Sequence, residues 1–542
     1  MSLVSPTVVA VLLVASGYLI WRMYKILAFT FGSPLRVFPG PPSPSWVYGN
    51  LKEMYAVEGT SLPDKWFEQY GKVYVDHEFF MTPRLWTLDT VALNHIMTHE
   101  SDYSRPELNI KELADIIGKG ILFVQDTGLG EKHRRQRRIL NPAFGPMQVR
   151  DLTEIFVRKS NELRDYWVHA TRAGPTTINV NADLSKMTLD VIGLAGFGYD
   201  FNALNLEGNP TELGIAFRQL FTSTSASDTS VLGYLFTWFP FLALILIHGP
   251  AQPNKRLTEL IKATAVIKRV GTQLVAERKA AILREASDRQ KQGVERKDLK
   301  GRDLLTLLIK ANMAKDVPES QRLSDEDVLG PATWALYALS QRPNIQQKLR
   351  EELLAVDTDT PTMDELNDLP YLDAVVRETL RLHSPITFLV REAKSDGVIP
   401  LGEPFTDRYG RVHKEIRIAK GNKVALPMIA MHRLTEIWGE DAMEFKPERW
   451  QKPPEEISTI PGVWGHLLSF LGGPRACIGY RFSLVELKAI LFSIIRGFEF
   501  EMPLPLEEYR IQTSPLQRPS VRSAPEKGWQ LPLLVKPFKG TV

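Results

Sequence analysis

The sequence of 542 residues predicts a mainly α-helical fold with a smaller β region, preceded by a transmembrane helix. Two long stretches, Ile155–Ala170 and Asn181–Phe197, place apolar residues at the spacing of amphipathic helices. The stretch from Trp66 to Leu88 instead groups its apolar residues in short runs with turns between them, which is typical of strands. An apolar run near the N-terminus predicts the membrane helix.

The composition allows one large core and excludes several classes of protein. Hydrophobic residues make up 44% of the chain, and we find no internal repeat or long low-complexity tract, which favours one large domain behind an anchor. The net charge of +3 is too small to indicate a nucleic-acid partner, but it allows a membrane surface or an acidic protein partner. A single cysteine excludes a disulfide scaffold and a cysteine-rich zinc or iron–sulfur site.

The apolar run extends from Val8 to Trp21, and counting from Leu3 gives 19 residues, enough to span a bilayer as a helix. No cleavage site follows it. Arg22 and Lys25 come directly after the run, and this charge asymmetry places the rest of the chain on the cytosolic side. A cleaved signal peptide and a buried helix are the alternatives. We expect an uncleaved anchor over residues 1–22.

A proline-rich segment follows this anchor. Phe38–Pro44 contains four prolines, which prevent a helix and favour the extended polyproline II conformation. We therefore expect a linker over residues 23–45.

The only cysteine, Cys477, lies in the glycine-rich stretch Phe470–Gly479. A single thiol is most often a small buried apolar group. Here the neighbouring glycines permit a tight turn or the close approach of a flat ligand, and Arg475 favours an ionised sulfur. The helix-like sequence that begins at Tyr480 would direct its positive end at that sulfur. A thiolate in such a loop is one of the ways in which proteins hold haem iron.

The spacing within this stretch resembles the haem-binding loop of the cytochrome P-450 superfamily, particularly its microsomal and fungal members, and the likeness extends over about Phe38–Phe538. It implies a mainly α fold that buries one haem b, with Cys477 as the axial ligand of the iron. The matching haem-binding positions are Phe470, Gly473, Arg475, Cys477 and Gly479.

Two further regions carry haem contacts implied by this resemblance. The basic stretch Gly130–Pro142 predicts a helix with His133 and Arg137 one turn apart. In the family, a tryptophan and an arginine at this spacing hold a haem propionate; His133 replaces the tryptophan and still offers a donor. Arg391 is a second propionate candidate. The other charges of the basic helix are solvated or face the acidic surface of an electron donor.

Glu378 and Arg381 share one face of a helix predicted over residues 370–383. The same spacing occurs elsewhere in the chain, so it carries little weight alone. Their order ahead of Arg449 and of the cysteine stretch strengthens the resemblance, which implies a buried charge network of these three side chains behind the haem loop. The implied role is structural.

The stretch Ser384–Arg391 resembles the family's pocket-lining strand, with Ile386, Phe388 and Leu389 facing the substrate. These apolar residues indicate a lipophilic small molecule, although core packing explains them equally well. A second apolar stretch, Val231–Ile247, has a proline at its centre and resembles the family's lid, which dips into the membrane.

The helix expected over Ser324–Ser340 should cross the distal face of the haem. In the family, this helix carries an acid–threonine pair that binds dioxygen and relays protons. This chain lacks the pair there, and Gly330-Pro331 should interrupt the helix, so we expect a truncated distal helix and name no catalytic residue. Asp228-Thr229 and Thr333 are weak substitutes.

The resemblance implies a monooxygenase that inserts one oxygen atom from O2 into a lipophilic small molecule, with electrons from an NADPH-dependent flavoprotein reductase. The haem-thiolate catalytic domain would cover residues 46–542 on the cytosolic side of the endoplasmic reticulum membrane, as a single-pass protein. Alternatives are a haem protein unable to activate oxygen, an isomerase-type variant and a mis-spliced product. From another class, a membrane-anchored interaction protein without haem also remains open.

Overall fold

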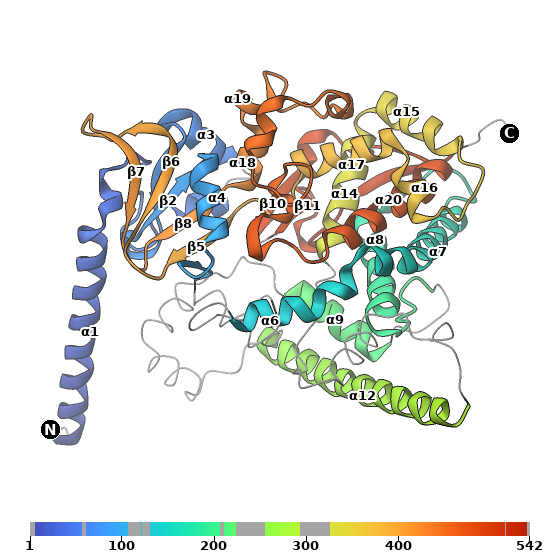
Figure 1. Cartoon of the computed structure of the whole chain (residues 1–542), viewed down its shortest axis with the longest axis horizontal. Coiled ribbons are helices and arrows are strands. Elements are labelled where there is room, and N and C mark those ends of the chain that lie inside the picture. The colour runs from blue at the N-terminus through green and yellow to red at the C-terminus, as the bar shows by residue number, and fades with distance from the viewer. Residues whose placement is uncertain are drawn as a thin grey trace. The chain divides into compact units, whose positions relative to one another are not determined.

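The computed structural model describes residues 6–56, 61–106, 121, 131–205, 211–223, 255–292, 326–514 and 516–538 (Figure 1). These residues form two compact units: the first contains the described residues within 6–106 and 388–430, and the second contains those within 121–387 and 431–538. The predicted lid Val231–Ile247, the pair Asp228-Thr229 and the proposed helix start at Ser324 lie outside the described residues.

The first unit is built on a five-stranded sheet with the order β1-β2-β8-β5-β3. β2 and β8 are parallel, and the other neighbours are antiparallel. A separate hairpin pairs β6 with β7. The elements of this unit are α1 (Pro6–Gly32), α2 (Leu51–Ala56), α3 (Ser61–Tyr70), β1 (Val73–His77), β2 (Pro83–Thr87), α4 (Thr90–Thr98), β3 (Tyr103–Ser104), β5 (Leu389–Ala393), β6 (Gly397–Thr406), β7 (Val412–Ile418) and β8 (Lys423–Leu426). The predicted strands between Trp66 and Leu88 are confirmed.

The proline-rich stretch has neither helix nor strand, as predicted, and it lies against β1. The carbonyl of Pro39 accepts the N–H of Val75 at 2.9 Å, and the side-chain amide of Asn50 donates to the carbonyl of Pro42 at 3.0 Å. The approach is close at Gly40, where a Cβ atom would meet the carbonyl oxygen of Val75.

In the described part of the chain, no helix is both long enough and apolar enough to cross a bilayer. The transmembrane helix expected over residues 1–22 is therefore not supported. The helix that does form, α1, extends beyond the apolar run through Arg22 and Lys25 to Gly32, so that apolar and charged residues belong to one element.

The second unit is mainly helical, and α20 (Tyr480–Gly497) runs through its core. Every residue from Phe482 to Ile495 is buried, as expected for a helix surrounded by other elements. α7 packs along it, with the rings of Phe156 and Phe482 edge to face at 4.6 Å. α14, α15, α16 and α17 also contact it.

The helices of this unit are α6 (Glu131–Leu140), α7 (Pro146–Ala170), α8 (Val180–Ile192), α9 (Glu212–Ser223), α12 (Lys255–Gln292), α14 (Glu326–Ser340), α15 (Pro343–Leu354), α16 (Met363–Asn367), α17 (Pro370–Leu382) and α19 (Thr435–Trp438); α18 (Met428–Arg433) begins at the end of the first unit. Two small sheets accompany them. One has the order β4-β12-β9 and the other pairs β10 with β11. Their strands are β4 (Thr176–Asn179), β9 (Phe498–Glu501), β10 (Tyr509–Ser514), β11 (Leu516–Val521) and β12 (Pro532–Pro537).

The predicted helices over Ile155–Ala170, Gly130–Pro142 and residues 370–383 are confirmed as α7, α6 and α17, with shifted ends. The helix predicted over Asn181–Phe197 is α8, which passes into a short π-helical turn at Gly193–Phe197.

The predicted interruption at Gly330-Pro331 is wrong, because α14 is continuous from Glu326 to Ser340 with Pro331 inside it. Proline removes only one backbone hydrogen bond near the start of this helix and costs about 3 kcal/mol. Complete burial of Leu336 and Leu339 alone contributes about 1.5–3 kcal/mol each, which outweighs that cost. The prediction of a truncated distal helix is likewise not supported, since α14 runs through the point of the expected break.

The start of α17 is stabilised by a carboxylate from α15. Glu352 accepts the N–H groups of Tyr371 and Leu372, both at 2.8 Å, and these amides have no partner inside their own helix. Glu352→Ala should lower the free energy of unfolding by about 1–3 kcal/mol in urea titrations.

The neighbouring Glu351 is the matched control. It is exposed and accepts one side-chain hydrogen bond from Gln347, so Glu351→Ala should change stability by no more than about 0.5 kcal/mol. Equal effects of the two substitutions would contradict the assigned role of Glu352.

Candidate active site

The cysteine loop, Phe470–Gly479, closes tightly just before α20. The N–H of Cys477 donates to the carbonyl of Phe470 at 2.9 Å, and Gly473 has φ +69°, a conformation that favours glycine. Gly479 is the residue that precedes the first turn of α20, and its carbonyl accepts the N–H of Ser483 at 2.9 Å. The thiol is partly exposed and precedes the positive end of a long helix, an environment that favours the thiolate.

α6 reaches this loop through Arg137. Its guanidinium donates to the carbonyl of Ala476, the residue before the cysteine, at 2.5 Å. His133, one turn earlier on the same helix, is buried, with 2% of its surface exposed. The structure therefore brings α6 to the cysteine loop, whereas binding of a propionate by either residue remains a prediction.

These residues fit a thiolate-ligated haem. The loop offers one partly exposed sulfur in a glycine-rich turn, and Arg137 beside it supplies a cation that suits carboxylates. The described residues contain no cluster of three or more histidine, cysteine or acidic side chains that would hold a separate metal ion.

Arg381 is the centre of the predicted charge network. It is fully buried beside Glu378, to which it donates two hydrogen bonds, from Nε at 2.9 Å and from Nη2 at 2.8 Å. Its remaining N–H groups reach three backbone carbonyls, those of His432 at 2.7 Å, Ala442 at 2.6 Å and Glu444 at 3.0 Å. A planar guanidinium can satisfy carboxylate and carbonyls together, so this one side chain joins α17 to the end of α18 and to the segment that follows α19.

Arg449 completes the network that the sequence predicted. Its Nε lies 3.5 Å from Glu378, and its Nη1 donates to Asp441 at 2.6 Å. Hydrogen bonds from Lys446 and Arg449 lower the pKa of Asp441 to about 2, so this carboxylate stays ionised. The indole N–H of Trp450 donates to the second oxygen of Glu378 at 3.0 Å. Asp441 and Trp450 were missed because no fixed spacing distinguishes them in the sequence.

His432 links this network to the cysteine loop and was also missed. It is fully buried; its Nδ1 lies 3.1 Å from the carbonyl of Arg381, and its Nε2 lies 2.7 Å from the N–H of Leu468. These partners require a neutral ring with the proton on Nδ1. Ser469 adds a second link, donating to the carbonyl of Leu380 at 2.7 Å. A lone histidine gives no sequence signal for such a role.

The pocket candidates are divided between the two units. Ile386 is half-buried in the second unit, whereas Phe388, Leu389 and Arg391 belong to the first. The ring of Phe388 packs on Trp86 at 5.0 Å between centroids, so part of its surface serves the core of that unit. Arg391 is buried on β5, with 4% of its surface exposed. Roles in substrate or propionate binding remain predictions.

Thr333, the weak substitute for a distal hydroxyl, is buried on α14. Its hydroxyl donates to the side-chain oxygen of Asn181 at 3.2 Å. In this structure the hydroxyl therefore joins α14 to α8, which is a packing role.

The sequence was compared with known families and proteins. The family model described as Cytochrome P450 matches residues 39–521. The chain is 47% identical over 536 residues to cytochrome P450 monooxygenase 205 of Postia placenta, and 48% identical over 538 residues to cytochrome P450 monooxygenase 128 of the same fungus; each alignment covers 96% of both chains. It is 33% identical over 522 residues to cytochrome P450 monooxygenase claW of Ampulloclitocybe clavipes, covering 92% of each chain.

His432→Leu should lower the free energy of unfolding by about 2–4 kcal/mol, because it leaves the Arg381 carbonyl and the Leu468 N–H buried without a partner. Urea unfolding measures the loss. His432→Gln, whose amide has both a donor and an acceptor, should lose less. Parent-like stability of the leucine variant would show that the two hydrogen bonds contribute little.

The burial of His432 should also make the stability of the protein depend on pH. Burial, aided by the positive charge of Arg381, lowers the pKa of His432 to about 3 from 6.5. At a pH between about 3 and 6.5, His432 therefore takes up a proton when the protein unfolds. Its contribution to stability is complete above pH 6.5 and decreases as the pH falls below that value. In urea titrations between pH 6 and 4, His432→Gln should lose stability less steeply than the parent, by about 1.4 kcal/mol per pH unit. Equal slopes would contradict the lowered pKa.

Proposed function

Because the chain belongs to the cytochrome P450 family, whose members are haem-thiolate monooxygenases and therefore oxidoreductases, we propose that it inserts one oxygen atom from O2 into a lipophilic small molecule. The observation that carries the proposal is the partly exposed thiol of Cys477 in a closed loop at the start of α20. When bound, the haem supplies the chemistry that activates dioxygen, and a thiolate ligand favours cleavage of the O–O bond.

In this proposal the residues of the second unit divide into three roles. Cys477 provides the axial sulfur, and Arg137 and His133 hold a haem carboxylate from α6. The Glu378–Arg381–Arg449 network holds the backbone on which the loop rests. The other loop positions, Phe470, Gly473, Arg475 and Gly479, shape the surface next to the ring. Arg391 of the first unit is proposed as a second ligand for a haem carboxylate.

The proposed electron source is NADPH, through a flavoprotein reductase. Support comes from α6, whose exposed basic residues follow one another over a single short helix; they are Lys132, Arg134, Arg135 and Arg138. A basic surface beside the cysteine loop suits an acidic redox partner, because complementary charge speeds encounter.

The proposed substrate is lipophilic. Ile386, Phe388 and Leu389 are all apolar and half-buried, so part of each side chain is accessible. The family relatives are named monooxygenases without a substrate in their names.

The proposed location is the endoplasmic reticulum membrane, with the catalytic part in the cytosol. Its support is the sequence alone, in which the apolar run from Val8 to Trp21 is followed by Arg22 and Lys25. The proposal concerns attachment to the membrane and not the way in which the chain is attached. Sedimentation with microsomes after a salt wash is the test, and a freely soluble full-length chain would contradict it.

Cys477→Ser tests the haem ligand. In the parent, the reduced protein treated with carbon monoxide should show the red-shifted Soret band of a thiolate-ligated haem, and the serine variant should lose it because a hydroxyl is a much poorer donor. Glu440, exposed and remote in sequence from the loop, provides a control as Glu440→Gln, which should keep the band. An unshifted band in the parent would exclude thiolate ligation.

The alternative with an observation in its favour is a haem protein that activates oxygen poorly, as an isomerase-type or mis-spliced product would. Its basis is the lack of an acid–threonine pair in the Ser324–Ser340 stretch and the engagement of the Thr333 hydroxyl by Asn181. Membership of an enzyme family argues against the haem-free interaction protein.

The fraction of consumed NADPH that yields oxidised product distinguishes these two functions. With reductase and a lipophilic substrate, the proposed monooxygenase should convert most of the NADPH consumed into oxidised product. Parallel assays of NADPH loss, product and hydrogen peroxide measure the partition. Peroxide as the main product, across a panel of substrates, would favour the alternative.

A further inference from the structure

A wide cleft lies between α17 and α20 in the second unit, and none of the proposed substrate side chains lines it. Its volume is about 1090 Å³. We call it the α17–α20 cleft; its walls also include residues of α7, α15, α16 and the segments around Trp450 and Trp464. Four aromatic side chains line it, and they are Tyr371, Trp450, Trp464 and Tyr480.

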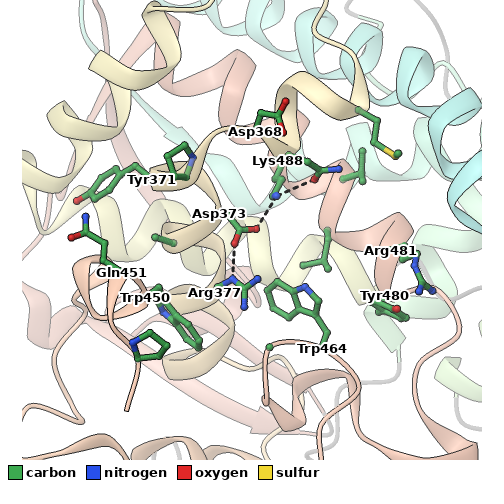
Figure 2. Close-up of a pocket in the computed structure, with 18 of the residues that line it drawn as sticks. Asp368, Tyr371, Asp373, Arg377, Trp450, Gln451, Trp464, Tyr480, Arg481 and Lys488 are labelled. Atoms are coloured by element: carbon green, nitrogen blue, oxygen red, sulfur yellow. Dashed lines mark hydrogen bonds and ion pairs between the residues drawn. The ribbon is translucent and has the colours of Figure 1, made fainter. Parts of the chain in front are cut away.

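Cations gather at one part of this cleft. The guanidinium of Arg377 lies 4.8 Å from the ring centre of Trp464 and 5.5 Å from that of Trp450, and Figure 2 shows it between the two indoles. Arg377 also donates to Asp373 at 2.5 Å, and Lys488 reaches the other oxygen of the same carboxylate at 2.8 Å. One carboxylate therefore serves two cations, of which Lys488 has only 5% of its side chain exposed.

Arg481 adds a third cation at the start of α20. It lies 4.4 Å from the ring centre of Tyr480, and among the described residues no carboxylate lies within ion-pair distance of it. Of the other carboxylates that line the cleft, Glu352 is already occupied by two N–H groups of α17, and Asp368 is exposed to solvent. This end of the cleft therefore has an excess of positive charge beside flat aromatic walls.

We propose that the α17–α20 cleft is a second ligand site that binds a small aromatic carboxylate, with its ring against Trp464 and Tyr480 and its charge toward Arg481 and the Arg377–Lys488 pair. Aromatic walls contribute stacking area. Lys488 is buried and Arg377 is half-buried, so these two cations attract an anion more strongly than they would in full solvent, and the exposed Arg481 adds its charge at the rim. Arg377 and Lys488 share the carboxylate of Asp373, and Arg481 adds a further positive charge, so a cationic ligand is excluded as the preferred class.

The site is also connected to the cysteine loop. The rings of Trp464 and Tyr480 each lie 6.1 Å from the ring of Phe470, the first residue of that loop. A ligand that contacts these two rings therefore contacts the side chains on which Phe470 packs. Occupation of the cleft should shift the absorption of the thiolate-ligated haem without displacing a ligand from the substrate side.

The test uses 2-naphthoate as the probe and the haem-loaded protein saturated with an azole, which occupies the haem-facing pocket. Calorimetric titration should show one saturable site for 2-naphthoate, whereas the neutral 2-naphthylmethanol should bind at least about tenfold more weakly. Arg481→Glu should weaken the affinity for 2-naphthoate by about tenfold or more, because it replaces an attracting charge with a repelling one.

Arg158→Glu is the matched control, because Arg158 lies on α7, outside the cleft, with 55% of its side chain exposed. It should leave the affinity unchanged, and both variants should retain parent-like haem content. Trp464→Leu should weaken binding of the ring-bearing probe. No binding of 2-naphthoate, equal binding of the neutral alcohol, or equal losses in the Arg481 and Arg158 variants would each overturn the proposal.

Discussion

The buried guanidinium of Arg381 is the interaction on which the second unit depends. Its five N–H groups are all engaged, by the two oxygens of Glu378 and by three backbone carbonyls from residues 432–444. Because the guanidinium of Arg381 is buried, it needs each of these hydrogen bonds. A charge taken out of water is stable only when it is paired and hydrogen-bonded. Loss of one partner from such a network typically costs about 3–5 kcal/mol. The backbone around Ala442 and Glu444, which lies outside helices and strands, is thereby held against α17.

Hydrogen bonds of two side chains connect the backbone just before the cysteine loop to this network. His432 joins the backbone of Arg381 to that of Leu468, and Ser469 bonds to Leu380. Arg137 of α6 donates to the carbonyl of Ala476, the residue before Cys477. The loop is thus fixed at its start by α17 and near its sulfur by α6, while α20 continues from its end. A metal-ligating sulfur requires this kind of support, because partners beyond the ligand set its orientation and its basicity.

The extent to which the sequence predicted this site depended on how local each signal was. The cysteine loop was found because its spacing is fixed, and the Glu378–Arg381 pair was found because it precedes Arg449 and that loop in a fixed order. His432, Asp441 and Trp450 gave no such signal, because each acts through a partner distant in the chain.

The wrong prediction at Gly330-Pro331 has a physical cause. A break at Gly330-Pro331 was expected from propensity, yet burial of the following residues of α14 outweighs the lost hydrogen bond. The transmembrane helix expected near the N-terminus is not supported, because no helix among the described residues meets the length and apolarity that a span requires. Local pattern predicted helix content well and predicted the environment of those helices less well.

Arg381→Lys tests the central claim most directly, because lysine keeps the buried positive charge but cannot reach Glu378 and three carbonyls at once. The measurement is the fraction of reduced, carbon monoxide-treated protein whose Soret band is red-shifted, taken together with helix content by circular dichroism. We expect the helices to be largely retained and the red-shifted fraction to fall sharply, since the loop loses its support. Parent-like spectra from the lysine variant would show that the charge alone is sufficient, and would contradict the account.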